Sequence, residues 1–187
     1  MEKLLVSSNL PALEKPQRSA RIVSMNILIH DVPGNPFGNC AADFEIVNAA
    51  DVSAVPCQGC FQCWTKNAGF CVYADAFQHS GAAAGKSENI VIVSRLCYGG
   101  YSPAVKRFLD RGISDCSPFL TFRKGRTYHI SRYKVKKHLS VYFYGECSDF
   151  ERETAEEYVA HHAVNMDAET HTVQFVERFE DFGEIRL

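Results

Sequence analysis

Short apolar runs, separated by loops and helical segments, account for most of the ordered pattern along this chain. The clearest run is Asn89–Ser94, which is continuous and β-branched, as in a strand covered on both faces. Similar runs predict four further strands, at Met25–His30, Phe44–Val47, His138–Tyr144 and Thr172–Val176. Two more short strands, Phe119–Phe122 and Tyr128–Ile130, flank Arg123–Arg126 and predict a hairpin.

Three segments between these strands have the features of helices. Ser102 is a typical N-cap, and Pro103 follows it at the first helical position, where its missing N–H costs nothing. The apolar residues of this helix recur at helical spacing: Val105, Phe108, Leu109 and Ile113. A second helix is expected from about Phe150 to Val164 after a cap at Ser148 or Asp149, and a weaker, Ala-rich one between Asp75 and Gly85.

The alternation of strands and helices predicts one α/β domain with a mostly parallel sheet over residues 25–187. Residues 1–24 are interpreted as an N-terminal arm, because Pro11 and Pro16 interrupt any helix and no period is visible. Ligands of such sheets bind at the carboxyl ends of the strands. The glycine-rich turn after Val93 lies at such an end, and so does the segment that follows Phe44–Val47.

Composition narrows the class of protein further. The chain has 187 residues and a formal net charge of −2, which argues against nucleic acid or an anionic membrane as the main partner. No apolar run is long enough for a membrane span, and Met1–Val6 lacks the apolar core of a secretory signal. A cytoplasmic location is therefore expected, where cysteines bind metals, take part in redox chemistry or stay reduced.

The densest chemistry in the sequence is a run of four cysteines, half of the eight in the chain. Cys57, Cys60 and Cys63 are spaced by three, and Cys71 follows. This spacing is close to that of compact ferredoxin motifs that hold a [4Fe–4S] cluster, although the last interval is longer. Zinc is less favoured, since structural zinc sites usually combine two separated pairs. Redox-active or simply buried thiols remain the alternative.

The turn from Ser94 to Ser102 also has two interpretations. It can form a backbone cradle against a flat cofactor, with Tyr98 or Tyr101 stacking on it, or it can be a turn that needs glycine for its φ angles. Lys106 and Arg111 on the following helix either pair with a cofactor phosphate or a neighbouring subunit, or form a solvated helix face.

Two of these stretches resemble the NAD(P)H-dependent FMN reductase and iron–sulfur flavoprotein superfamily. The first is Cys57–Trp64 with Gly69–Cys71, and the second is Tyr98–Ser102, continued by a helix with Lys106 and an Asp110–Arg111 pair. Further similar positions are Gly125-Arg126, Tyr128-His129, Arg132-Tyr133, Tyr144-Gly145-Glu146 and Ala163-Val164-Asn165. Together they extend the resemblance over roughly residues 25–176.

The resemblance implies a flavodoxin-like three-layer sandwich with a five-stranded, mostly parallel sheet in the order 2-1-3-4-5. It implies an FMN-dependent oxidoreductase with NAD(P)H as a possible donor, a homo-oligomer (dimer or tetramer), and a small molecule or a protein as electron partner. The residues that it places at the cofactor are Ser94, Arg95, Leu96, Cys97, Tyr98, Gly99, Gly100 and Tyr101. A [4Fe–4S] cluster on Cys57, Cys60, Cys63 and Cys71 is a further possible cofactor.

The sequence departs from this family most clearly after its first strand. Family members have a Ser/Thr/Arg-rich turn and a long helix there, whose N-terminal N–H groups hold the FMN phosphate. Here His30–Asn39 holds no serine or threonine, Asp31 repels phosphate, and the gap before the next strand is too short for a full helix. Arg95 and Cys97 replace the usual proline and tyrosine of the flavin turn, and Asp75-Ala76 stands where an acidic pair is common.

Each charge-assisted hydrogen bond to a phosphate is worth on the order of 1.5–3 kcal/mol, so losing several weakens FMN binding by orders of magnitude. Arg95 can replace one such contact. Three functions therefore remain open. The chain is an FMN-dependent NAD(P)H oxidoreductase, a flavodoxin-like binding or assembly subunit that has lost FMN, or an iron–sulfur electron carrier.

Overall fold

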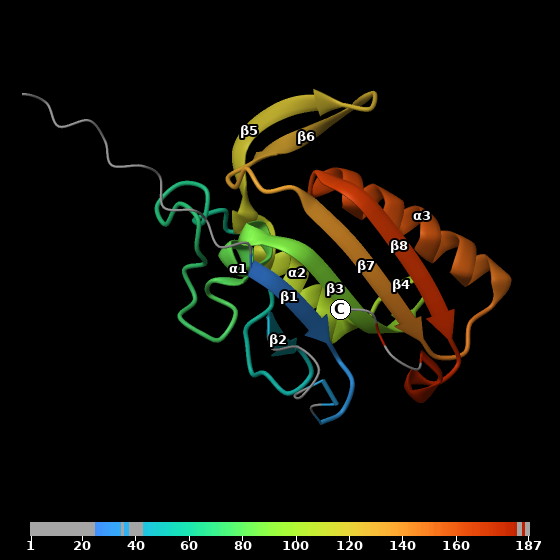
Figure 1. The fold of residues 1–187 in the computed structure, drawn as a ribbon. Coiled ribbons are helices and arrows are strands. Elements are labelled where there is room, and N and C mark those ends of the chain that lie inside the picture. The colour runs from blue at the N-terminus through green and yellow to red at the C-terminus, as the bar shows by residue number, and fades with distance from the viewer. Residues whose placement is uncertain (1–24, 35, 38–42, 183–184, 186–187) are drawn as a thin grey trace, which may run out of the picture.

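A twisted parallel sheet forms the centre of the molecule (Figure 1). The computed structural model describes residues 25–34, 36–37, 43–182 and 185. The five parallel strands are β1 (Met25–His30), β2 (Phe44–Asn48), β3 (Ser87–Cys97), β7 (Lys137–Tyr144) and β8 (Ala168–Val176). Their spatial order is β2-β1-β3-β7-β8, and every neighbouring pair is parallel. This is the flavodoxin-like order 2-1-3-4-5, so the predicted fold class is confirmed.

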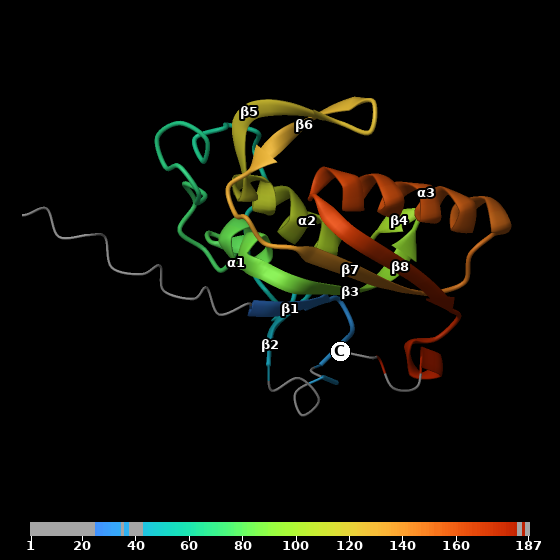
Figure 2. The same cartoon turned by 45° about the horizontal axis from the view of Figure 1, so that its top comes forward.

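The three helices of the described chain lie on one side of this sheet (Figure 2). They are α1 (Ser80–Lys86), α2 (Pro103–Arg111) and α3 (Asp149–Asn165), and the short 3-10 helix η1 (Gly112–Asp115) follows α2. Both predicted caps are present. The Ser102 hydroxyl accepts from the N–H of Val105, and Ser148 forms a capping box with Glu151. These caps satisfy N–H groups that a helix cannot pair within itself.

Residue alternation along the strands separates two apolar layers. On the helix side, side chains such as Ile29, Ile92 and Val141 pack against Val105 of α2 and Val159 of α3. Because successive side chains of a strand point to opposite faces, their neighbours Leu28, Val91, Val93 and Tyr142 form the second layer.

The second layer is covered by loop and tail rather than by helices. Phe37, between β1 and β2, packs there with Phe179 and Phe182 of the 3-10 helix η2 (Phe179–Phe182). The described residues between β1 and β2 form only bends and turns. This agrees with the expectation that the first helix is missing or much shortened. Aromatic side chains of a loop and the C-terminal segment thus cover this face where a helix layer is expected.

The predicted hairpin is present as β5 (Cys116–Arg123) and β6 (Arg126–Ser131). It forms a separate two-stranded sheet that stands beyond the helices (Figures 1 and 2). Its turn residues Lys124 and Gly125 both have positive φ, 46° and 78°, as a tight hairpin turn requires.

Two expectations concern parts of the chain beyond this architecture. The N-terminal arm, residues 1–24, lies outside the described residues. Among the described residues, no helix is both long and apolar enough to cross a membrane.

Candidate functional site

The four cysteines lie in the long connection between β2 and α1, and they line one pocket. Cys57, Cys60, Cys63 and Cys71 surround a space of about 100 Å³. The other side chains that close this pocket are mainly apolar, including Phe61, Val72, Tyr73 and Ile113. Segments fourteen residues apart in the sequence therefore converge on one small cavity.

A buried arginine holds this connection in place. Arg111, at the end of α2, is 2% exposed, and its guanidinium binds both carboxylate oxygens of Asp75 at 2.7 and 2.8 Å. It also donates to the carbonyl oxygens of Val55 and Tyr73, which flank the cysteine run. The Asp75 carboxylate accepts in addition from the N–H groups of Val55 and Phe77. The hydrogen bond from Arg111 is the main reason why the pKa of Asp75 lies below its usual value.

The sequence interpretation of Arg111 was therefore wrong. Neither a solvated helix face nor a free phosphate ligand describes a buried guanidinium whose two terminal nitrogens both donate to acceptors of its own chain. Lys106 does match the solvated alternative, since it pairs with Asp110 at 2.6 Å with about half of each side chain exposed. Helical spacing alone could not separate the two, because what buries Arg111 is a loop that lies thirty-six residues or more away.

The four thiols differ in exposure but act on one another. Cys57 and Cys60 are exposed, Cys71 is half-buried and Cys63 is buried, and none forms a disulfide. The pKa of Cys63 is raised, first by burial and then by the neighbouring Cys71, Cys57 and Cys60. Within the described chain, no three His, Cys, Asp or Glu groups form a site for a single metal ion. A [4Fe–4S] cluster makes a different demand, since each of its four irons takes one thiolate.

The glycine-rich turn is a tight hairpin rather than an open loop. The end of β3 pairs with β4 (Gly100–Tyr101) in antiparallel fashion, Cys97 opposite Gly100. The two turn residues, Tyr98 and Gly99, have φ angles of 52° and 75°. Gly99 also packs on α3, where a Cβ would lie 2.7 Å from Thr154 Cγ2. Close packing against a helix is thus a sufficient reason for this glycine.

Several residues of the predicted flavin turn point inward. The Tyr101 ring stacks on Phe143 with 5.5 Å between centroids, and its hydroxyl lies 2.9 Å from Nδ1 of His162. The buried Ser94 hydroxyl accepts from the N–H of Ser102 and donates to the carbonyl of Arg95. Leu96 is buried and Gly100 is half-buried.

The residues of this turn that reach the surface are Arg95, Cys97 and Tyr98, and Tyr98 is 96% exposed. Cys97 and Tyr98 line a shallow hollow of about 690 Å³ together with Cys57 and Lys106. Cys57 therefore lies on the wall of both this hollow and the four-cysteine pocket.

At the carboxyl end of β1, where a cofactor phosphate is expected, the Asp31 carboxylate accepts several hydrogen bonds. Both oxygens of Asp31 accept from the N–H of Arg95 at 3.1 Å, and Oδ1 also accepts from the hydroxyl of Tyr144 at 3.0 Å. Burial and Asp31 together raise the pKa of Tyr144. The N–H of Gly145 is used by the carbonyl oxygens of Val176 and Glu177.

A carboxylate of the chain and its own carbonyl groups thus occupy the donors at these strand ends. An FMN phosphate at this edge would find these donors engaged and would meet the negative charge of Asp31. The described residues after β1 therefore do not fit a phosphate.

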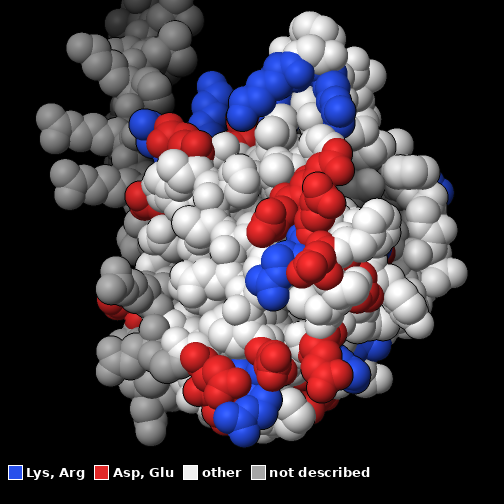
Figure 3. All heavy atoms as spheres, turned by 90° about the vertical axis from the view of Figure 1, so that its right-hand side faces the viewer, with Lys and Arg blue, Asp and Glu red and all other residues white. Residues whose placement is uncertain are grey.

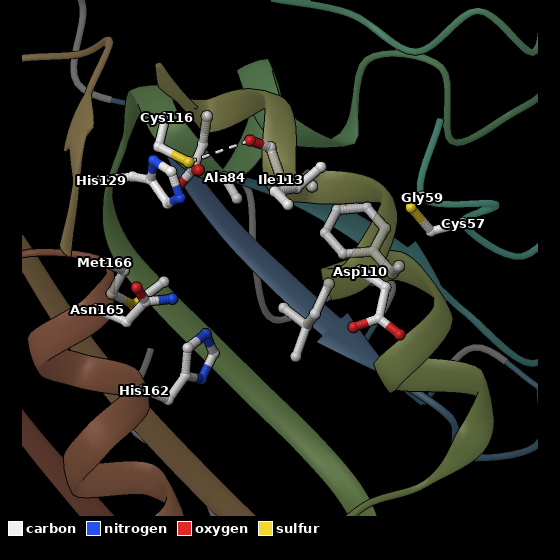
Figure 4. A pocket seen from close by; sticks show the side chains of 14 residues that line it. Cys57, Gly59, Ala84, Asp110, Ile113, Cys116, His129, His162, Asn165 and Met166 are labelled. Carbon is white, nitrogen blue, oxygen red and sulfur yellow. Dashed lines mark hydrogen bonds between the residues drawn. The ribbon is translucent and has the colours of Figure 1, made fainter. Parts of the chain in front are cut away.

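A larger cavity, of about 440 Å³, lies beside the cysteine pocket on the helix side of the sheet (Figure 4). His129, His162 and Asn165 contribute polar groups to its wall, and Cys57 lies at its edge. Desolvation of the partly buried ring lowers the pKa of His162 to about 4, so the ring is neutral at pH 7. The sequence pattern predicts only a helix end at His162. Its helical spacing from Ala155 and Val159, both core residues, is the signal that would have placed it on the inward face of α3.

A parallel five-stranded sheet in the order 2-1-3-4-5, with the helices of the described chain on one face, defines an α/β protein of flavodoxin-like fold. Several solved structures share this fold at very low sequence identity. They include an FMN-dependent NADH-azoreductase from Bacillus anthracis in complex with FMN, with 9% identity, 81% of this chain and 86% of that one covered, and a TM-score of 0.53. A second is the NAD(P)H:quinone oxidoreductase from Methanothermobacter marburgensis, with 11% identity, 82% and 84% coverage and a TM-score of 0.52.

Another azoreductase from Bacillus anthracis matches with 11% identity, covers 84% of this chain and 89% of that one, and has a TM-score of 0.52. No family model matches the chain. No curated protein matches it either. The similarity therefore establishes the fold that this chain shares with FMN-dependent NAD(P)H oxidoreductases.

Proposed function

We propose that this chain is an electron-transfer protein whose redox group is a [4Fe–4S] cluster held by Cys57, Cys60, Cys63 and Cys71. The observation that supports the proposal is that all four cysteines line the same small pocket. Cys57 and Cys60 are exposed, so they are not simply buried apolar residues, and they line this pocket together with Cys63 and Cys71.

The size and lining of the pocket suit a cluster better than an organic cofactor. At about 100 Å³ it is well below the roughly 300–1,000 Å³ of pockets that hold cofactor-sized molecules. When bound, the cluster supplies a one-electron redox centre. The chain contributes four thiolates, the apolar cover of Phe61, Val72 and Tyr73, and the buried positive charge of Arg111 at the pocket wall.

Anaerobic reconstitution tests this proposal directly. The protein, incubated with ferrous iron and sulfide and then desalted, is expected to retain about four irons and four sulfides per chain. Cys63→Ser and Cys71→Ser should lose most of this iron. Cys97→Ser and Cys147→Ser, which change cysteines outside the pocket, serve as matched controls and should retain it. Equal iron in all four variants, or none in the unmodified protein, would refute the cluster.

A second candidate function is an FMN-dependent NAD(P)H oxidoreductase. The hollow of about 690 Å³ beside Cys97 and Tyr98 favours it, because its volume lies in the range of cofactor sites and its position is the predicted flavin turn. The fold that the chain shares with the FMN-bound azoreductase supports the same assignment. Lys106, on the wall of this hollow, is a cation that can replace a missing phosphate contact.

Flavin titration separates this candidate from the first. FMN at about 100 µM, a concentration well above typical cofactor affinities, is added and its fluorescence quenching is followed. Binding that is lost in Tyr98→Ala, but kept in a control variant on the hairpin, Tyr128→Ala, would support a ring at this turn. Unquenched FMN with the unmodified protein would reject the flavin and leave the cluster proposal untouched.

A further inference from the structure

The β5–β6 hairpin exposes several large apolar side chains. Phe119, Leu120 and Phe122 are 71%, 60% and 72% exposed, and Ile130 is also exposed. The hairpin is a two-stranded sheet of its own, not an extension of the central sheet. Leu120 and Phe122 lie two residues apart on β5, so they share one face of the hairpin, and exposed apolar surface of this kind marks interaction sites.

The turn of the same hairpin is strongly basic. Arg123, Lys124 and Arg126 lie within four residues, and Lys124 and Arg126 are exposed. Within its own chain the turn is held above the C-terminal end of α3. Arg126 Nη1 lies 3.0 Å from Nε2 of His161, and Arg123 pairs with Asp167 at 2.7 Å.

The N-terminal half of α3 carries acidic residues on the same side of the helix as His161. His161, Glu157 and Glu153 are spaced by four residues, so they follow one another along one side of the helix. Phe150 continues this stripe toward the N-terminus and is 77% exposed. Figure 3 shows the right-hand side of the molecule in Figure 1. On this face, basic side chains gather at the top and acidic side chains lie below them. One helix therefore carries a basic hairpin at its C-terminal end and an acidic, aromatic surface at its N-terminal end.

We propose that two copies of this chain associate through this surface, with the two α3 helices antiparallel about a two-fold axis. In that arrangement the basic turn of each protomer meets the acidic half of α3 on the other. Lys124 then faces Glu153, and Phe122 packs near Phe150. A two-fold interface is self-complementary, so each charge pair occurs twice. The partner is a second copy because the chain itself carries both complementary halves.

Sedimentation equilibrium of the full chain at low salt tests this arrangement. The unmodified protein is expected to be dimeric. Lys124→Glu and Glu153→Lys should each weaken the dimer about tenfold or more, since each places like charges together twice. The double variant, Lys124→Glu with Glu153→Lys, exchanges the two charges and should restore dimerisation to within about threefold.

Two further variants keep the test decisive. Arg178→Glu changes an exposed charge of the C-terminal segment, on the opposite face of the sheet, and should leave the dimer unchanged. Phe122→Ser should abolish dimerisation while the far-UV circular dichroism stays the same. A monomer at about 100 µM unmodified protein, or a double variant no better than the single ones, would overturn the proposed interface. Tight dimers normally form well below that concentration.

Discussion

The carboxyl edge of the sheet and the cysteine connection differ in whether their functional groups are already paired within the chain. At the edge, the donors of Arg95 and Tyr144 are taken by Asp31, and that of Gly145 by the tail after β8. In the cysteine connection, the backbone is fixed by Arg111 and Asp75, while the thiols are left facing a shared pocket. The hydrogen-bond donors at the carboxyl edge are thus paired within the chain, whereas the thiols of the cysteine connection form no disulfide.

This difference explains why fold and function separate in this protein. A parallel sheet creates binding positions at its strand ends for purely topological reasons. Whether a ligand can use them depends on the groups that arrive there, and here the Asp31 carboxylate and the carbonyl oxygens of Val176 and Glu177 engage the donors. The cysteine pocket, in contrast, is lined by the connection between β2 and α1 and by the end of α2, and no α-helix N-terminus of the described chain contributes to it.

The largest expected effect on the free energy of unfolding comes from removing Arg111, which binds Asp75 in the cysteine connection. Arg111→Met deletes the buried guanidinium and leaves the Asp75 carboxylate without its main partner. Breaking such a pair costs about 3–5 kcal/mol, which urea unfolding would measure as a lower midpoint. Lys106→Met, on the same helix but in an exposed ion pair, should cost less than about 1 kcal/mol. Equal losses in both variants would show that the connection does not depend on Arg111.

The cavity beside this connection gives a pH-dependent prediction. The pKa of His162 is about 4 in the folded state against an ordinary 6.5. Between these values the unfolded chain takes up a proton that the folded chain does not, so stability falls as pH falls through this window. The full shift corresponds to about 3 kcal/mol.

The pH dependence of the free energy of unfolding, measured between pH 7 and pH 4, checks this expectation. His162→Gln should flatten the curve by about one proton. A slope unaffected by His162→Gln would show that the ring is not kept neutral.

A smaller loss is expected at the carboxyl edge. Asp31→Ala leaves the hydroxyl of Tyr144 and the N–H of Arg95 without their acceptor. Unsatisfied, partly buried donors cost about 1–3 kcal/mol, measurable by urea unfolding. If Asp31→Ala instead raised stability in phosphate buffer relative to chloride at equal ionic strength, the edge would still be an anion site and the contrast between the two regions would fail.

The smallest effect is expected where α3 begins, just beyond the same edge. Ser148→Ala removes the hydroxyl that accepts from the N–H of Glu151. Loss of an N-cap costs about 1 kcal/mol, seen as a small shift of the urea midpoint. Ser148→Asp retains an acceptor at this position and should be neutral within error. A large loss in both variants would indicate that this turn has a tertiary role beyond capping.

The chain by itself determined the strand pattern, both main helix caps and the hairpin, because these depend on residues close together in sequence. The continuous apolar run of β3, the Ser102-Pro103 start and the Lys124-Gly125 turn each carry a local physical signal. The weak Ala-rich helix was placed only approximately. It begins at Ser80 rather than near Asp75, because Asp75 is engaged by Arg111.

Only the tertiary structure decided what these elements do together. Arg111 had the sequence signature of a surface residue, and a distant loop made it a buried clamp. Tyr101 could have faced a ligand, yet its ring stacks on Phe143 in the core and its hydroxyl is hydrogen-bonded to His162. The convergence of four thiols, the closure of the β1 edge by Asp31 and the burial of His162 all depend on contacts between segments far apart in the chain, and local pattern carries no information about such distances.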